Sequence, residues 1–225
     1  MILFLIFFLF VFVLPKFWLS NAMKKNDEEL MNMPFTAEEF GQIILKENNL
    51  SDVKIEETEQ IDHYDLHDKT VRVQQGRLAK KSLTSLTIIC HEIGHAIQHK
   101  EEYGPLVRRT SLVERTQWIS KFGGVILYSG LPLILATGSF GLIKVCLLLV
   151  LISVLLGVFI HLITLDVEID ASFNRAMPIL EEKIPTEYHS QCKNVLQAAA
   201  YTYVIGALTS FLSLRYIWLL LSRVR

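Results

Sequence analysis

Four apolar stretches alternate with charge-rich segments along this chain. Each is close to the length of about 20 residues that a helix needs to cross the hydrocarbon core of a bilayer. The first is interrupted by Pro15 and Lys16, and the last contains Arg215 near its end. The pattern predicts four transmembrane helices, at residues 1–19, 122–143, 145–165 and 198–221.

The first stretch has a second interpretation as a secretory signal peptide. Ser20, Asn21 and Ala22 follow it and resemble a cleavage site with small residues. No basic residue precedes the apolar run, although signal peptides usually begin with one. We therefore favour a retained membrane anchor at residues 1–19.

The polar segments carry periodic patterns of their own. Thr36 and Glu39 have the spacing of a capping box, so a helix is expected from Thr36 to about residue 46. Alternating apolar residues near 53–55 and 71–73 predict short strands. A second helix is expected over residues 82–99.

The charges are unevenly distributed, which supports the same division of the chain. The 225 residues are 51% hydrophobic, with 22 Lys and Arg against 23 Asp and Glu, so a basic nucleic-acid-binding protein is excluded. Residues 20–121 and 166–197 hold 40 of the 45 charged side chains. A water-soluble domain needs charges all over its surface. We therefore predict a mostly α membrane protein, with four transmembrane helices and a small α+β domain.

Four spans would place both polar segments on the same side of the membrane. Lys and Arg residues near the span ends are more frequent on that side than on the other. Four spans make this a multi-pass protein, which we expect in a bacterial-type cell membrane. The positive-inside rule then predicts that its polar segments face the cytoplasm.

The motif His91-Glu92-Ile93-Gly94-His95 carries the clearest chemistry. On a helix, His91 and His95 lie one turn apart and face the same side, so both imidazoles can bind one Zn²⁺. Glu92 is rotated by about 100° from His91, where it can act as a general base on a water molecule. The alternative is that these are ordinary core or surface residues.

A catalytic zinc site needs a third protein ligand, and Glu168 is the best candidate. It follows the third apolar stretch, on the side of the membrane where four spans also place the histidine pair. Asp170 could replace Glu168 as the ligand or orient a ligand histidine. His99 lies about 12 Å from His91 along a straight helix, too far to share its metal. We therefore expect it to lie behind the metal ligands or on the protein surface.

The sequence resembles the YugP-type neutral zinc metallopeptidases of bacterial membranes and, more distantly, the HtpX-type membrane zinc proteases. The similarity covers nearly the whole chain and includes Asp62-His-Tyr-Asp65, the His-Glu-x-x-His block and Val167-Glu-Ile-Asp-Ala-Ser172. It implies a membrane-integrated zinc peptidase with a zincin-like domain and Glu168 as the third ligand. The chain departs from these patterns at Leu66, where the family usually has Pro, and at Ser172, where HtpX-type proteins have Asp.

Three further features need an interpretation, and the first two of them allow two. The Asp62–Asp65 block is either a turn held by Asp side chains, which we favour, or part of a substrate site in which Lys69–Val73 offers a strand edge and His63 stabilises an oxyanion. His161 is either a functional intramembrane group or a packed side chain. Cys90 is best explained by packing.

Together these features predict a zinc-dependent metallopeptidase that cuts peptide bonds of membrane or membrane-proximal proteins. Its domain would span residues 20–121, with a third-ligand segment at 166–197 and a transmembrane hairpin at 122–165. One Zn²⁺ is the expected cofactor, and a protein or peptide substrate and the lipid bilayer are the expected partners, with no nucleic acid. The alternatives are a membrane scaffold with a structural metal site and, much less favoured, a di-iron enzyme, for which a second Glu-x-x-His motif is missing.

Overall fold

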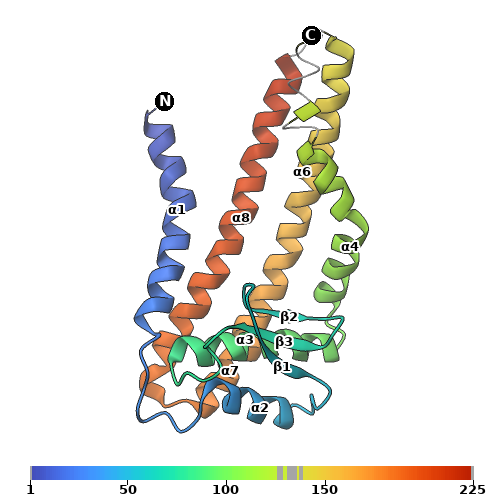
Figure 1. Ribbon diagram of the computed structural model, residues 1–225. Helices are drawn as coiled ribbons and strands as arrows, with labels where there is room; N and C mark the ends of the chain where they lie inside the picture. The colour runs from blue at the N-terminus through green and yellow to red at the C-terminus, as the bar shows by residue number, and fades with distance from the viewer. Residues whose placement is uncertain (1, 126–128, 131–135, 137–138, 224–225) are drawn as a thin grey trace. The chain divides into compact units, whose positions relative to one another are not determined.

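A computed structural model describes residues 2–125, 129–130, 136 and 139–223 of the chain (Figure 1). The described part is mostly helical, with one small sheet. Its elements, in chain order, are α1 (Ile2–Lys25), α2 (Ala37–Glu47), β1 (Lys54–Thr58), β2 (His63–Asp65), β3 (Thr70–Gln74), α3 (Leu83–Lys100), α4 (Gly104–Val125), α6 (Phe140–Ile169), the π-helix η2 (Asp170–Ala176), α7 (Met177–Lys183), the 3₁₀-helix η3 (Thr186–Tyr188) and α8 (His189–Arg223).

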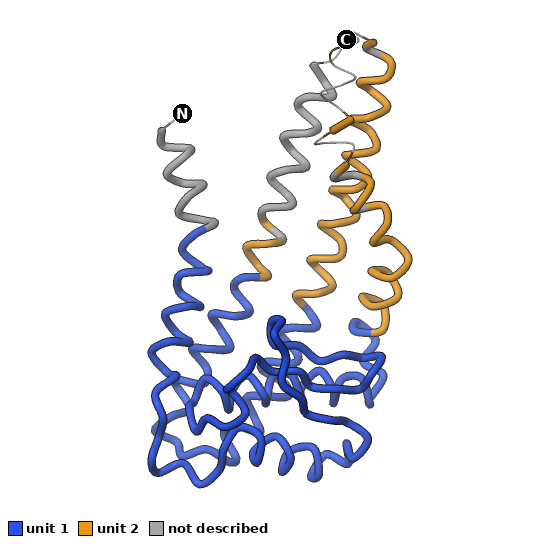
Figure 2. The backbone as a smooth tube through the Cα atoms, viewed as in Figure 1, with its two compact units in different colours: residues 1–106, 166–202 blue, residues 107–165, 203–225 orange. Residues whose placement is uncertain are grey.

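The chain divides into two compact units (Figure 2). Unit 1 combines residues 1–106 with residues 166–202, and unit 2 combines residues 107–165 with residues 203–225. Unit 1 therefore brings together two polar segments that lie far apart in the sequence.

The sheet of unit 1 has the strand order β1-β3-β2. β1 pairs with β3 in parallel and β2 pairs with β3 antiparallel, so that Ile55 and Tyr64 flank Val71 on either side. Val71 and Val73 are fully buried. Because β3 is the central strand, residues 69–73 have no free edge, and the less favoured alternative, in which a substrate pairs with that edge, is ruled out.

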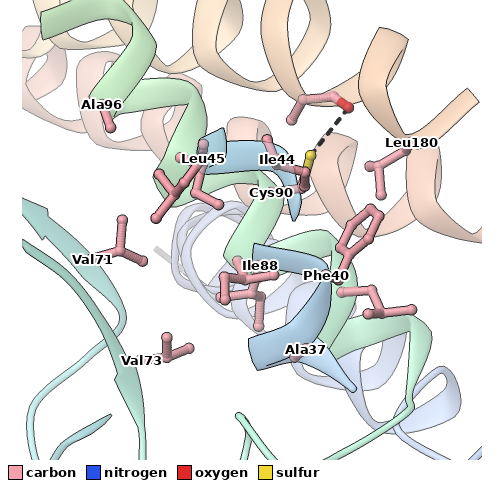
Figure 3. Close-up of a cluster of buried hydrophobic side chains, with 14 of the residues drawn as sticks. Ala37, Phe40, Ile44, Leu45, Val71, Val73, Ile88, Cys90, Ala96 and Leu180 are labelled. Atoms are coloured by element: carbon pink, nitrogen blue, oxygen red, sulfur yellow. Dashed lines mark hydrogen bonds between the residues drawn. The ribbon is translucent and has the colours of Figure 1, made fainter. Parts of the chain in front are cut away.

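Helices α2, α3 and α7 build the hydrophobic core of unit 1 together with β3 (Figure 3). The largest fully buried side chains include Phe40 and Ile44 of α2, Ile89 and Ile93 of α3, and Leu180 of α7. Residues that are distant in the sequence thus share one core, and this packing holds α3 in the interior of the unit.

The predicted start of α2 is confirmed. The Thr36 side chain accepts a hydrogen bond from the Glu39 backbone, and the Glu39 carboxylate accepts one from the Thr36 backbone. This pair satisfies two backbone N–H groups that the first helical turn leaves free. The strands near 53–55 and 71–73 and the helix at 82–99 are also confirmed.

The expected four transmembrane helices are wrong for the part of the chain that the structure describes. By length and composition, one helical stretch there, Gly141–Lys183, can cross a bilayer, and 22% of its most apolar window is buried. It contains the expected span at 145–165. The cytoplasmic placement of the polar segments depended on counting four spans, so it loses that basis.

The expected and observed membrane spans differ because helix continuity and packing cannot be deduced from composition alone. Residues 122–143 do not form one described helix, since they begin in α4 and end in α6, and 126–128, 131–135 and 137–138 lie outside the described residues. Apolar side chains also leave water by packing against protein. Trp18 of α1 does so, with its ring centroid 5.2 Å from that of Tyr201 in α8.

Candidate metal centre

Helix α3 places the two histidines of the motif on one face. Ser82 begins the helix, because its side chain accepts a hydrogen bond from the Ser85 backbone. Further along this helix, His91 and His95 lie one turn apart, and the centroids of their rings are 4.8 Å apart. Both histidines are half-buried, whereas Cys90 and Ile93 on the core side are fully buried. The helix thus directs two imidazoles away from the core.

Glu168, near the end of α6, meets this pair. Its carboxylate oxygen lies 3.3 Å from Nε2 of His91 and 3.6 Å from Nε2 of His95. The three donor atoms all lie within 4.8 Å of one another. The structure therefore brings together His91, His95 and Glu168, the three residues that the sequence predicted as metal ligands. We call them the donor group.

A glycine in the motif permits this close approach. A Cβ atom at Gly94 would lie 2.8 Å from the backbone oxygen of Ala171, closer than real Cβ contacts allow. Ala171 belongs to η2, the π-helix that begins two residues after Glu168. Helices α3 and η2 can therefore touch only because residue 94 has no side chain.

The second nitrogen of each imidazole also has a partner. Nδ1 of His91 lies 3.1 Å from the Ser172 hydroxyl, and Nδ1 of His95 lies 2.9 Å from Oε1 of Gln98. Both Nε2 atoms face Glu168 instead. Such contacts fix the orientation of a metal-binding ring.

Two pKa shifts reflect the burial of the site. Burial raises the pKa of Glu92, whose side chain is almost inaccessible to solvent. Burial opposes the charged form of His95, but the hydrogen bond and the charge of the Glu168 carboxylate outweigh it and raise the pKa of His95 to about 9. Without a metal ion, the site therefore favours the protonated, charged form of His95.

Comparison with known proteins identifies the family. The chain matches, over residues 1–222, the family described as "Putative neutral zinc metallopeptidase". The chain belongs to this family. It is also 33% identical over 214 residues to the "Putative membrane protease YugP" of Bacillus subtilis (strain 168), with 92% of each chain covered. No solved structure matches the chain.

The donor group fits the metal in the name of the neutral zinc metallopeptidase family. Zinc bonds to imidazole and carboxylate are about 2.0–2.2 Å long, so tetrahedral ligand atoms lie about 3.3–3.6 Å apart. The two distances from the Glu168 oxygen match this spacing. Among the described residues the group has three donors, the number that catalytic zinc sites use.

Other predicted residues of this family member lie outside the donor group. Asp170 accepts hydrogen bonds from Gln98, Asn174 and Arg175, so it is not one of the clustered donors. Nδ1 of His99 lies 3.0 Å from the Tyr64 hydroxyl, which agrees with its predicted place away from the metal ligands.

Cys90 and His161 both have packing contacts. The Cys90 thiol is buried and donates to the backbone oxygen of Ala176, and burial raises its pKa, so it stays protonated. A Cβ atom at Gly206 would meet the His161 ring at 3.4 Å, so this ring lies against the backbone of α8.

The Asp62–Asp65 block has a structural role, as we favoured, although His63–Asp65 form strand β2 and the turn comes directly after it. The Asp65 carboxylate accepts hydrogen bonds from the backbones of His67 and Asp68. Asp62 accepts one from the Gln74 backbone and thereby joins the block to the end of β3. Nδ1 of His63 lies 2.8 Å from the backbone oxygen of Ile61, which supports the structural interpretation.

Sequence reasoning missed the part played by Gln98, which it left without a role. The available signal was its spacing, because residues three apart on a helix are neighbours on its surface. Gln98 is three residues beyond His95, fully buried, and bonded to the imidazole of that histidine.

Proposed function

We propose that this protein is a zinc-dependent peptidase that hydrolyses peptide bonds in membrane or membrane-proximal proteins. The observation that carries the proposal is the approach of the Glu168 carboxylate to Nε2 of both His91 and His95, beside the buried carboxylate of Glu92. Family membership and the similarity to a protein named a membrane protease support it.

In this proposal His91, His95 and Glu168 hold one zinc ion. The ion would act as a Lewis acid that polarises a peptide carbonyl and makes water acidic enough to attack at neutral pH. Two neutral imidazoles and one carboxylate leave the site a net positive charge once Zn²⁺ is bound. A site of that charge attracts the oxygen on which negative charge develops.

Glu92 would act as the general base and acid. It is the next residue after His91 on α3, so it borders the metal ligands without facing Glu168. Its carboxylate would take a proton from the attacking water and then pass it to the leaving amine. Burial raises the pKa of Glu92, which makes the carboxylate a stronger base than one in water.

Two observations support the proposed substrate class. The helical stretch Gly141–Lys183 is long and apolar enough to cross a bilayer, and the similar protein from Bacillus subtilis is named a membrane protease. We therefore propose a membrane-attached enzyme, whose accessible substrates are proteins in or next to the bilayer.

The test replaces Glu92 by Gln in the full-length protein, purified in detergent and loaded with zinc. Cleavage of an unfolded protein such as casein should fall by about 10²–10⁴-fold, the usual share of general acid–base catalysis. Zinc content should stay at one ion per chain, because Glu92 is not a ligand. The matched control is Glu38→Gln, which removes an exposed carboxylate from α2 and should retain full activity.

Three results would contradict the proposal. Unchanged cleavage by zinc-loaded Glu92→Gln would eliminate the assigned base. A Glu168→Ala protein that binds zinc as tightly as the unaltered chain would eliminate the assigned ligand. Tight zinc binding without any cleavage by the unaltered chain would favour a structural metal site instead.

A further inference from the structure

We propose that Gln98 and Asp170 are positioning residues that together fix the tautomer of the His95 imidazole. The inference rests on the proposed zinc site and adds a function to two residues outside the donor group. It starts from four hydrogen-bonding groups in or next to α3 and η2, namely the His95 ring, the Gln98 amide, the Val167 backbone oxygen and the Asp170 carboxylate.

The orientation of the Gln98 amide is determined by its two acceptors. Nε2 of Gln98 donates to the backbone oxygen of Val167 at 2.8 Å and to the Asp170 carboxylate at 2.8 Å. Both partners only accept, so the NH₂ group must point to them. The amide oxygen is thereby directed at Nδ1 of His95, 2.9 Å away.

This orientation determines which imidazole nitrogen carries hydrogen. An amide oxygen can only accept, so Nδ1 of His95 must donate. Nε2 of the neutral ring then keeps its lone pair, and Nε2 is the atom that faces Glu168. Only the tautomer with hydrogen on Nδ1 offers Nε2 to a metal.

Asp170 is itself firmly held. Its carboxylate also accepts hydrogen bonds from Asn174 at 2.9 Å and from Nε of Arg175 at 3.1 Å. The Arg175 guanidinium pairs with Glu101 and lies 5.9 Å from the ring centre of Tyr103. The carboxylate therefore has a fixed place from which to orient the amide.

His91 has no comparable contact that determines its tautomer. Its Nδ1 faces the Ser172 hydroxyl, which can donate or accept, so this contact is compatible with either tautomer. The two ligand histidines are therefore held unequally. We expect the loss of Gln98 to weaken the metal site through His95 in particular.

The experiment compares zinc affinity and histidine tautomer in three variants of the full-length protein. Gln98→Met keeps the size of the side chain but removes every hydrogen bond. Asp170→Ala removes the carboxylate that orients the Gln98 amide. The matched control is Thr84→Val, which removes a buried hydrogen bond between α3 and the backbone of Met23, away from the metal site.

Zinc dissociation constants come from competition with a chelator, and the tautomer of His95 in the metal-free protein comes from ¹⁵N NMR of the ring at a pH well above about 9, where the ring is neutral. We expect Gln98→Met to weaken zinc binding by about 10–100-fold, the usual effect of losing such an orienting contact. It should also give a mixture of His95 tautomers. Asp170→Ala should shift both measurements in the same direction but by less, because the Val167 oxygen still accepts a hydrogen bond from the Gln98 amide, and Thr84→Val should leave both unchanged.

The proposal is overturned if Gln98→Met binds zinc as tightly as Thr84→Val, or if His95 keeps one tautomer in Gln98→Met. An Asp170→Ala protein whose zinc affinity and His95 tautomer match those of Thr84→Val also contradicts it. Neither readout uses peptide cleavage. Failure of the proposed peptidase activity would therefore appear separately, as a zinc-binding protein that cleaves nothing.

Discussion

At the scale of single residues, the carboxylate of Glu168 controls the charge of the neighbouring imidazole. Glu168 lies 3.6 Å from Nε2 of His95, and its hydrogen bond and charge overcome the effect of burial. A raised pKa means that the protonated form persists to higher pH. The proton on His95 is then present below about pH 9 and lost as the pH rises through that value.

The first prediction concerns the metal-free protein. Its His95 ring should titrate near pH 9, well above the ordinary histidine value of about 6.5, as measured by NMR of the ring protons. Because zinc must displace this proton, zinc affinity should fall as the pH is lowered below about 9.

The comparison variant is Glu168→Gln, which is nearly the same size but uncharged. Burial is then opposed only by the charge of Glu92 and the Gln98 hydrogen bond, so the pKa of His95 should fall well below about 9. If His95 titrates at the same pH in both proteins, Glu168 does not control it.

At the scale of elements, the site depends on the contact between α3 and η2. Glu168 lies in the last turn of α6, directly before η2, and Ser172 within η2 contacts His91. Gly94 lets the two backbones touch, since a Cβ atom there would collide with the Ala171 oxygen. A π-helix is rare and often marks a functional site, and here it lies directly against the motif helix.

Gly94→Ala should therefore separate these two elements. The collision is with backbone atoms, which cannot move aside cheaply, so we expect the free energy of unfolding to fall by about 1–3 kcal/mol. Zinc affinity should fall as well, because Glu168 moves with η2. Denaturant unfolding and chelator competition measure the two effects.

The control for this prediction is Gly157→Ala in α6, where a Cβ atom would meet nothing within 4 Å. Alanine is better than glycine within a helix, so this variant should be as stable as the unaltered protein or slightly more stable. If Gly94→Ala matches this control in stability and zinc affinity, the close contact is unimportant.

Several elements could be predicted from the sequence because their signals are local. The capping box at Thr36 and Glu39 starts α2, and alternating apolar residues mark β1 and β3. The strand order could not be predicted, because pairing joins residues that are distant in the chain. The less favoured alternative, in which residues 69–73 offer a free edge, is therefore ruled out only by the structure.

At the scale of the whole molecule, the metal group connects two distant segments of one unit. His91 and His95 belong to residues 1–106 of unit 1, and Glu168 belongs to residues 166–202. A zinc ion bound to all three would tie these segments together. Ligands that bind only the folded state stabilise it by mass action.

Removing zinc should therefore destabilise unit 1. With free zinc about 100-fold above its dissociation constant, binding contributes about 2.7 kcal/mol to the free energy of unfolding. Adding a chelator should lower the melting temperature accordingly, as followed by thermal unfolding in detergent.

Glu168→Ala provides the comparison, because it removes the ligand that connects the second segment. Its melting temperature should respond little to the chelator. An equal decrease in both proteins would show that zinc stabilises the fold without Glu168.

The sequence by itself determined the local chemistry of this protein. The spacing of His91 and His95 places two imidazoles on one helical face, and the apolar stretch at 145–165 is long enough for a bilayer. These features depend on periodicity and composition, which are properties of short segments. The sequence also nominated Glu168, although the parity of four spans used in that argument is wrong for the described residues.

Only the tertiary structure decided how these segments meet. It alone showed the distances from Glu168 to the imidazoles, the Gln98 amide between His95 and Asp170, and the contact at Gly94. Each depends on packing between residues more than 70 positions apart. Such contacts arise from the burial of a shared core, which leaves no periodic signal in the chain.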